Sequence, residues 1–430
     1  MNVTSRTSYS DHGHRLLMVG FNRPLIAELN AIMPRASLTV LEEPNVYQRK
    51  GLAAVREVTE CISEVILAPY QQSEHFLPEV LAAHARAPFS AVLPGQEYGV
   101  TPAAIVAARL GLPGAGIESA RILSDKLLLR EVTSKAGMAA PMFLEVHKFE
   151  DVEAFLSRSD GRAVLKPANR QASLGVTVID SAEEAEYAWT QLVTAEEPRQ
   201  VSDRAWHHRY LIEERLHGPE VSVEALVVSG RINFSNVTQK ITAGGSHPVE
   251  TGHVLPAPLA ATVEQLLRES MEALVDAVGF DTGILHAEWI IQGGRPVLIE
   301  CAGRAPGDYL CDLINLAYGF SFIDTARKIL AGADATAPIR PKQGAAITFL
   351  TAAPGTVTNV SGLDEARATP GVVEAVLTAE VGDSVRTLRN SGDRLGFVIA
   401  TAPDSSAAGH TADHAASLIK ILTDRNEAGA

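Results

Sequence analysis

Short apolar runs alternate with helical patterns along the first 118 residues. Each run is brief and almost uninterrupted, as in a buried strand, and each helical pattern gathers its apolar residues on one face. Strands that alternate with helices predict parallel βαβ units. We therefore expect an open parallel α/β domain over residues 1–118. Its strands are expected at 14–21, 37–41, 64–68 and 89–93, and its helices at 24–32, 77–87 and 101–110.

Residues 119–335 mix longer β runs with helices and predict a central α+β domain. In the run 220–228, apolar residues alternate with Ser222 and Glu224, which is the period of a strand with two different faces. Ser119 is a typical N-cap for a helix at 119–136. Further helices are expected at 183–193, 260–278 and 309–330, and strands at 162–166, 176–179, 210–214 and 231–241.

The pattern changes again near residue 336, where shorter strands resume. A turn at 353–356 separates them, and a helical pattern closes the chain. We expect a small C-terminal α+β domain at 336–430. Its strands are expected at 345–350, 372–377 and 394–401, and its helix at 407–422.

Composition narrows the class of protein. The 430 residues are 46% hydrophobic and 20% charged, which is an ordinary balance for a globular protein of more than one domain. The net charge of −14 argues against a nucleic-acid surface, although it leaves room for a local basic pocket. The three cysteines show no disulfide or metal spacing, and no apolar run is long enough to cross a membrane. We expect a cytoplasmic protein with neither nucleic-acid nor membrane partners.

A hairpin at 284–304, with its turn at Gly293-Gly294, carries the most informative chemistry. Each strand holds one carboxylate among apolar residues, Glu288 on the first and Glu300 on the second. Burying a carboxylate is costly unless something neutralises it. Two carboxylates on adjacent strands can hold a divalent cation against phosphates. The alternative is a solvent-facing pair on an ordinary hairpin. Cys301 should point to the opposite face and is expected to be a buried, inert thiol.

Several nucleotide-binding motifs are absent. No Gly-x-Gly-x-x-Gly follows the first strand, which argues against a nicotinamide dehydrogenase, and the chain lacks a Gly-x-x-x-x-Gly-Lys-Ser/Thr loop. Lys126 near the start of a helix and Lys166 at the end of a strand can instead supply point charges for phosphates. A loop of small and polar residues at 167–175 can cover phosphates with its amides. Either lysine alone is more typical of a solvated surface.

Taken in order, five stretches resemble the ATP-grasp superfamily over residues 119–330. They are Ser-Asp-Lys ending at Lys126, Leu-Lys-Pro around Lys166, the Glu-x-x-Leu stretch at 213–216, Glu288, and Glu300. The resemblance implies two α+β subdomains that enclose ATP, with Mg²⁺ (Mn²⁺ as a substitute) on Glu288 and Glu300. Position 302 is Ala where the family pattern has Asn, which leaves a second metal open. The implied nucleotide-binding residues are Lys126, Lys166, Ser173, Glu213, Glu214, Leu216, Glu220 and Lys240.

Within that superfamily, the chain is most similar to the L-amino acid ligases, which make dipeptides and related amides. The stretches that carry this resemblance are 250–253, 304–308 and 392–398. It implies that Arg304 faces the carboxylate to be phosphorylated, and that Lys166, Glu250 and His253 take part in catalysis. The implied substrate contacts are Glu250, His253, Arg304, Gly307 and Asp308.

The implied reaction joins two small-molecule amino acids through an acyl phosphate and releases ADP and phosphate. Phosphoryl transfer needs positioning and charge neutralisation rather than a covalent enzyme group, which lysines, a metal and an arginine can supply. The resemblance also implies a homodimer. Two alternatives stay open: another ATP-grasp carboxylate chemistry, such as a biotin-carboxylase-like enzyme or a formate-dependent transformylase, and an ATP-binding regulator without turnover.

Overall fold

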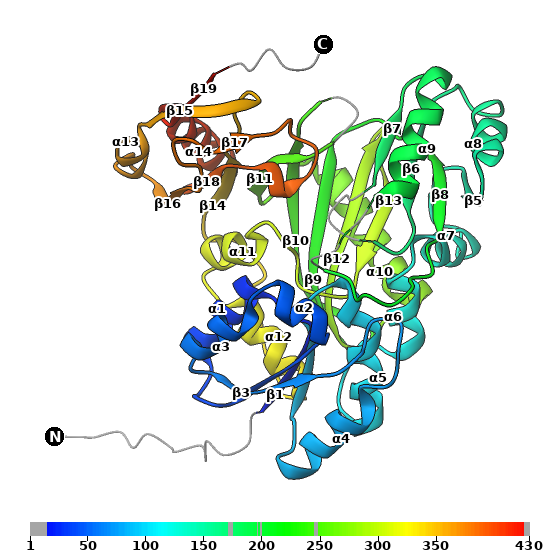
Figure 1. The fold of residues 1–430 in the computed structure, drawn as a ribbon, viewed down its shortest axis with the longest axis vertical. Helices are drawn as coiled ribbons and strands as arrows, with labels where there is room; N and C mark the ends of the chain where they lie inside the picture. The colour runs from blue at the N-terminus through cyan, green and yellow to red at the C-terminus, as the bar shows by residue number, and fades with distance from the viewer. Residues whose placement is uncertain (1–14, 171–174, 196, 198–199, 245–247, 425–430) are drawn as a thin grey trace.

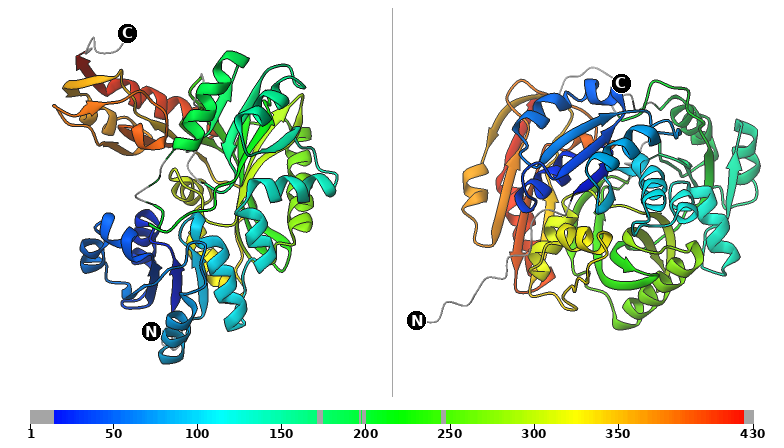
Figure 2. Two further views of the ribbon diagram at one scale, coloured as in Figure 1. Left: turned by 45° about the vertical axis from the view of Figure 1, so that its right-hand side comes forward. Right: turned by 90° about the horizontal axis from the view of Figure 1, so that it is seen from below.

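The computed structural model describes residues 15–170, 175–195, 197, 200–244 and 248–424. The chain forms three bodies (Figures 1 and 2). The N-terminal part lies at the bottom of Figure 1, the C-terminal part at the upper left, and a small sheet with two helices at the upper right. Residue 14, the first of the predicted opening strand, and Ser173, in the predicted phosphate-covering loop, lie outside the described residues.

The N-terminal domain is the predicted parallel α/β sheet, with strand order β3-β2-β1-β4. Helices α4 and α5 pack on one face of the sheet, and α1 lies on the other. The prediction of alternating strands and helices is confirmed. The elements are β1 (Leu16–Val19), α1 (Arg23–Ile32), β2 (Leu38–Glu42), α2 (Pro44–Arg49), α3 (Leu52–Val58), β3 (Ile62–Leu67), α4 (Leu77–Arg86), β4 (Ala91–Pro94) and α5 (Val100–Leu110).

The single helix predicted at 119–136 is wrong, because two helices occupy this stretch. Ser119 lies inside α6 (Ile117–Leu123) and is not its cap. Asp125 has an extended backbone and accepts hydrogen bonds from the amides of Leu127 and Leu128. It therefore caps a new helix, α7 (Lys126–Lys135), at its first turn. This break fixes the position of Lys126 at a helix N-terminus.

A four-stranded antiparallel sheet forms the small subdomain, in the order β5-β8-β6-β7. Helices α8 and α9 cover it, with a core of aliphatic residues and Phe155. The predicted strands of this region are confirmed, and Lys166 lies near the end of β6. The elements are β5 (Phe143–Val146), α8 (Phe149–Leu156), β6 (Ala163–Pro167), β7 (Thr177–Ile179), α9 (Ala185–Thr194) and β8 (Tyr210–Glu214).

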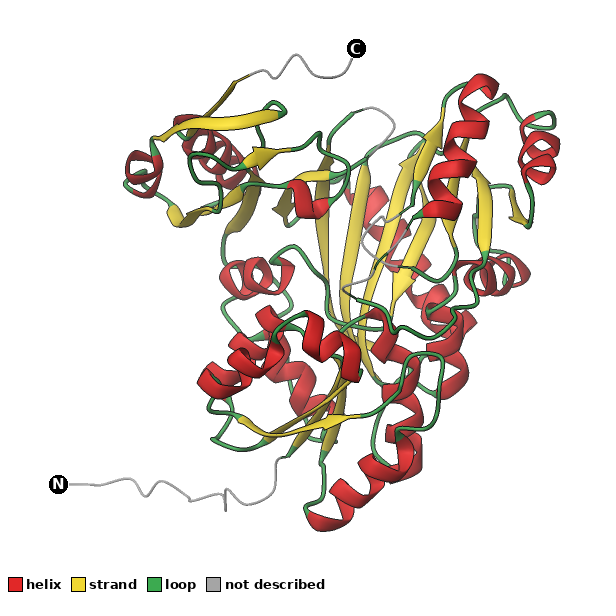
Figure 3. Cartoon of the chain, viewed as in Figure 1, coloured by secondary structure: helices red, strands yellow, loops and turns green. Residues whose placement is uncertain are grey.

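An eight-stranded sheet runs through the middle of the molecule, in the order β13-β12-β9-β10-β11-β14-β18-β16 (Figure 3). Helix α10 packs with α6 and α7 on one side of it, and α11 and α12 contribute to the core on the other. Both faces are covered, so Ser222 and Glu224 are buried as well as their apolar neighbours. The elements of this region are β9 (Glu220–Val228), β10 (Arg231–Thr242), β11 (Glu250–Leu255), α10 (Ala261–Val278), β12 (Gly283–Gln292), β13 (Arg295–Ala302), α11 (Leu310–Tyr318) and α12 (Phe322–Leu330).

The long helix predicted at 309–330 is also wrong. Gly319, with φ of 71°, ends α11, because a left-handed residue cannot continue a helix. Ser321 then caps α12 by accepting a hydrogen bond from the amide of Asp324. The resulting helix pair lets α12 pack against β4 of the N-terminal sheet.

The C-terminal part is joined to the central sheet by strand pairing between β11 and β14. Its predicted α+β content is confirmed, whereas the predicted domain boundaries stay predictions. The final helix is shorter than the predicted 407–422, because it ends at Leu418 and β19 pairs with β15. The elements are β14 (Gly344–Phe349), β15 (Gly355–Ser361), α13 (Leu363–Arg367), β16 (Val372–Leu377), β17 (Ser384–Val385), β18 (Gly396–Ala402), α14 (Ser405–Leu418) and β19 (Lys420–Asp424). No helix in the described part of the chain has the length and apolarity needed to cross a membrane.

Candidate active site

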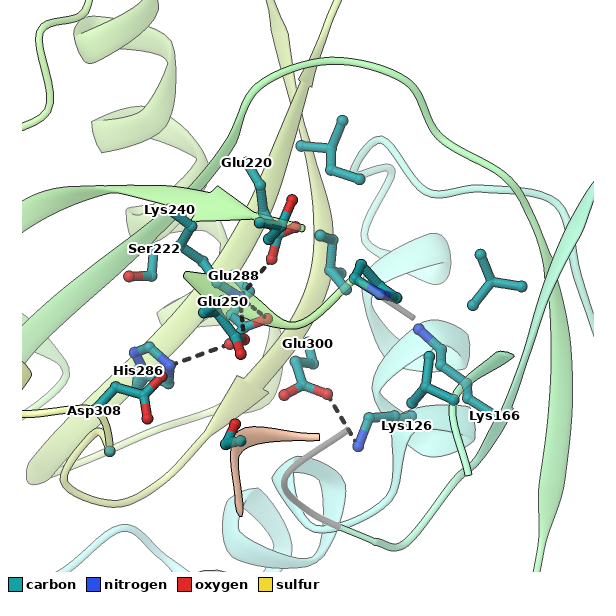
Figure 4. Close-up of a pocket in the computed structure, with 18 of the residues that line it drawn as sticks. Lys126, Lys166, Glu220, Ser222, Lys240, Glu250, His286, Glu288, Glu300 and Asp308 are labelled. Carbon is teal, nitrogen blue, oxygen red and sulfur yellow. Dashed lines mark ion pairs between the residues drawn. The ribbon is translucent and has the colours of Figure 1, made fainter. Parts of the chain in front are cut away.

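A cavity of about 600 Å³ lies where the three parts of the chain meet. Its volume is in the range of small-molecule sites. One end is apolar, because β6 and β7 of the small sheet face β12 and β13 of the large one. The other end is dense in charged side chains (Figure 4). The apolar lining residues are Val164, Val176, Val178, Leu216, Ile290 and Ile299. This shape fits a flat ring at one end and phosphates at the other.

Nearly every residue predicted to form the site lines this cavity. Ser173 is the exception, because it lies outside the described residues. The others come from the start of α7, from β6, from β8 and the loop after it, from β9, β10, β11, β12 and β13, and from the turn that follows β13. They are Lys126, Lys166, Glu213, Glu214, Leu216, Glu220, Lys240, Glu250, His253, Glu288, Glu300, Arg304, Gly307 and Asp308.

The two hairpin carboxylates face each other across β12 and β13. Glu288 is the register partner of Glu300, which places both side chains on the cavity side of the sheet. Cys301 lies on the opposite face, 3% exposed, where burial raises the pKa of its thiol. As expected, Glu300 and Cys301 lie on opposite faces of β13.

Lysines balance these carboxylates. Lys126 lies 3.0 Å from Glu300. Lys240 contacts Glu220, lies 2.9 Å from Glu288 and lies 3.3 Å from Glu250 (Figure 4). Burial alone would lower the pKa of Lys240, but the surrounding carboxylates raise it well above its ordinary value. Lys240 therefore carries a positive charge on the side of the cavity where Glu288 lies.

Glu213, which the resemblance implied as a nucleotide-binding residue, is instead occupied by two cations of the protein. It is buried, 2.5 Å from Arg130 and in contact with Lys166. Burial raises the pKa of its carboxyl, but the two cations hold it below its ordinary value. Glu214, in contrast, is exposed to solvent. Glu213 thus fixes Lys166, and Arg130 is a site residue that the sequence reasoning missed.

His286 was also missed. It lies two residues before Glu288 on β12, with Nδ1 at 3.1 Å from Glu224 and Nε2 at 3.3 Å from Glu288. Despite its burial, these two carboxylates raise its pKa to about 9. Its register partner is Ala302, the position where Asn was expected. The chain thus places beside that alanine an imidazole that is paired with Glu224 and Glu288.

Arg304 is fixed by a residue of the N-terminal domain. Its Nε donates to Glu97 at 2.8 Å, and its Nη1 donates to the carbonyl of Ala305 at 2.9 Å. Glu97 follows β4, at the carboxyl edge of the parallel sheet, where ligand sites of such folds occur. Glu97 was not among the predicted site residues. Its place directly after a predicted parallel strand was the feature of the sequence that could have indicated it.

The residues available for a metal fit one Mg²⁺. Within the described part of the chain, no group of three or more His, Cys, Asp or Glu side chains is placed to hold a metal by itself. Mg²⁺ is commonly held by one or two carboxylates together with substrate phosphates. Glu288 and Glu300, opposite one another and facing the cavity, match that donor set.

The free energy of unfolding of the wild type is expected to fall more steeply in acid than that of the Asp308→Asn variant. Burial favours its neutral form, but hydrogen bonds from His253 and Arg394 hold its pKa below 3.8. A lowered folded-state pKa stabilises the fold above the ordinary pKa, and this contribution is lost as the pH falls through the folded-state pKa. Urea unfolding should show a wild-type advantage at about pH 7 that shrinks below about pH 4. A difference independent of pH would contradict the ion pair.

The comparisons with known proteins agree with this geometry. The ATP-grasp domain family matches residues 161–312, and the family described as L-amino acid ligase C-terminal domain 2 matches residues 348–424. Alanine–anticapsin ligase of Bacillus subtilis (strain 168) is 27% identical over 266 residues, which are 58% of this chain and 55% of that protein. D-alanine–D-alanine ligase of Pseudomonas entomophila is 26% identical over 234 residues, 52% of this chain and 68% of that protein.

Solved structures show the same fold. The L-amino acid ligase from Bacillus licheniformis superposes with a TM-score of 0.78 at 18% identity, over 96% of this chain and all of that one. N5-carboxyaminoimidazole ribonucleotide synthetase from Thermotoga maritima gives a TM-score of 0.65 at 17% identity. This superposition covers 96% of this chain and 100% of that one. The alignments to alanine–anticapsin ligases span little more than half of those proteins' length.

The fold and the site thus define a protein with an ATP-grasp domain. More particularly, residues 348–424 match the family described as L-amino acid ligase C-terminal domain 2. The predicted superfamily, branch and fold class are confirmed. The named relatives agree with the predicted enzyme class, a ligase that forms carbon–nitrogen bonds.

Proposed function

We propose that this protein is an ATP- and Mg²⁺-dependent ligase that joins the carboxyl group of one amino acid to the amino group of another. One observation carries the proposal: Glu288, Glu300 and Arg304, which lie on one hairpin and its following turn, face the same cavity as Lys126 and Lys166. This set combines a metal-binding carboxylate pair, phosphate-binding lysines and a carboxylate-binding arginine. The names of the ligase relatives support the same reaction.

Each charged group has a part in the proposed reaction. Lys126 and Lys166 hold the phosphates of ATP, with Glu213 and Arg130 fixing Lys166. Glu288 and Glu300 would hold Mg²⁺, which when bound supplies charge neutralisation at the phosphates. Arg304 binds the substrate carboxylate, and its contact with Glu97 holds the guanidinium in place before the reaction.

The proposed chemistry proceeds in two displacements. A carboxylate oxygen of the acid attacks the γ-phosphorus of ATP, ADP leaves, and an acyl phosphate forms. The amine nitrogen then attacks the acyl carbon, the amine loses a proton, and phosphate leaves as the amide forms. Arg304 is close to the carboxyl group in both displacements and stabilises the oxyanion of the second. Glu250 and His253 contact the substrate from β11.

The protein is proposed to act on small-molecule amino acids as a cytoplasmic homodimer. The purified chain should therefore release one ADP and one phosphate for each amide, in a matrix of amino acid pairs with ATP and Mg²⁺. The measurements are coupled ADP detection and mass spectrometry of the products.

Three outcomes would contradict the proposal. Formation of AMP and pyrophosphate would exclude an acyl phosphate. Bicarbonate- or formate-dependent ATP turnover without any amino acid would favour the carboxylase or transformylase chemistry. ATP binding with no ADP formation across the whole matrix would favour a regulator without turnover.

A further inference from the structure

One side chain of the C-terminal part, that of Arg394, contacts two residues of the cavity wall, Asp308 and Glu250, and has no part in the proposed reaction so far. Arg394 lies just before β18, in the stretch 392–398 that resembles the L-amino acid ligases. It is buried, with a side chain 7% exposed, and its guanidinium lies over the ring of Phe349 at 3.9 Å from the centroid. The nearby Ser391 lines the cavity.

Arg394 forms a bidentate ion pair with Asp308. Nη1 donates to Oδ1 of Asp308 at 2.8 Å, and Nη2 donates to Oδ2 at 3.0 Å. This is the bidentate arrangement that makes arginine–carboxylate pairs strong and directional. Nη2 also donates to Glu250 at 3.1 Å and to Ser391 at 2.7 Å. The positive charge that pairs with the Asp308 carboxylate therefore comes from Arg394, in the C-terminal part of the chain.

The same contact fixes the turn that carries Asp308. Asp308 and Tyr309 have φ of 55° and 61°, a left-handed conformation that side-chain-bearing residues adopt only when their surroundings hold them there. Tyr309 packs on Phe397 of β18, with ring centroids 4.3 Å apart. The C-terminal domain thus sets both the charge and the shape of residues 307–309.

The position of Asp308 indicates which part of a substrate it meets. Arg304, Glu288 and Glu300 define where the carboxylate is phosphorylated, and Asp308 follows Arg304 across the Gly307 turn. Asp308 lines the cavity beside Glu250 and His253, with Nε2 of His253 at 3.2 Å from its Oδ2. Under the proposed function, Asp308 therefore faces a part of the acid substrate other than the carboxylate that Arg304 binds.

We propose that Arg394 is a specificity-determining residue that cancels the charge of Asp308, so that this end of the pocket takes an uncharged part of the acid substrate. The inference rests on the proposed function. An unpaired Asp308 would attract a cationic side chain. With Arg394 in place, a cationic side chain meets a carboxylate whose charge is already paired. The acid substrates favoured at this position are amino acids with neutral side chains.

Replacement of Arg394 by Met tests the proposal, because Met keeps an apolar stem over Phe349 and removes the charge together with its hydrogen bonds. The ratio of kcat/KM for a lysine acid substrate to that for alanine should rise about tenfold, since the freed Asp308 can pair with the lysine ammonium. The amine partner is held constant, and fragmentation mass spectrometry of each dipeptide shows which amino acid supplied the carboxyl. Arg394→Lys, which keeps the charge, should leave the ratio close to that of the wild type.

Asp308→Asn gives the mirror experiment and is nearly isosteric, so it remains informative if Arg394→Met does not fold. Arg394 then lacks its bidentate partner, and an acid substrate with an anionic side chain, such as aspartate, should gain about tenfold over alanine. Arg386→Met, at an exposed position of the same domain, is the matched control and should change neither ratio.

The outcomes separate this inference from the proposed function. A wild-type protein that forms dipeptides, with opposite shifts in the two variants, supports both. Dipeptide formation with unchanged charge preference in the folded variants overturns the role of Arg394 and leaves the proposed function standing. Absence of any amide from the wild type overturns the proposed function and this inference with it.

Discussion

Replacement of Glu300 by Gln is expected to abolish ligase turnover while leaving the fold intact. Glu300 faces Glu288 across the hairpin and lies 3.0 Å from Lys126. The substitution removes one of two proposed metal-binding carboxylates with almost no change of shape. Charge stabilisation by a bound metal is worth several kcal/mol in a phosphoryl-type transition state, so turnover should fall by about a thousandfold or more.

ADP release in the amino acid matrix measures the loss of turnover, and Mn²⁺ binding followed by electron paramagnetic resonance reports on the site without requiring turnover. Circular dichroism should match that of the wild type. Glu272→Gln, on the exposed side of α10, is the matched control and should keep full activity. If Glu300→Gln retained wild-type turnover and Mn²⁺ affinity, the assignment of the hairpin carboxylates to a metal would fail.

Replacement of Arg304 by Ala should lower kcat far more than it weakens ATP binding. Arg304 is held by Glu97, away from the apolar end of the cavity where the ring of ATP fits. Loss of one oxyanion donor typically lowers kcat by about 10²–10³-fold. Equilibrium binding of a fluorescent ATP analogue should change little, because the lysines and the apolar end of the cavity remain in place.

Arg295→Ala provides the control for Arg304, since Arg295 is an exposed arginine at the start of the same strand. It should leave both turnover and nucleotide binding unaltered. Near wild-type turnover in Arg304→Ala would show that the oxyanion role is wrong. An equal loss of turnover and ATP binding would instead mean that Arg304 acts on the nucleotide.

Local sequence was sufficient to predict the parallel N-terminal sheet, most strands of the central domain and the face of β13 on which Glu300 lies. These features depend on side-chain periodicity and on the alternation of a strand, which neighbours along the chain determine. The breaks at Asp125 and Gly319 were missed for a different reason. Both lie within continuous helical patterns, and a single cap or left-handed residue outweighed the periodicity.

The partners of the site residues depended on the tertiary structure. Arg130 and Glu213 are 83 residues apart, Glu97 and Arg304 are 207 apart, and Asp308 and Arg394 are 86 apart. No periodicity relates such distant positions, because their proximity follows from how the sheets and helices pack. The sequence by itself therefore determined which side chains could hold phosphates, a metal and a carboxylate, including the hairpin pair. Only the tertiary structure decided which of their charges are already paired, because ion pairs depend on distance in space rather than along the chain.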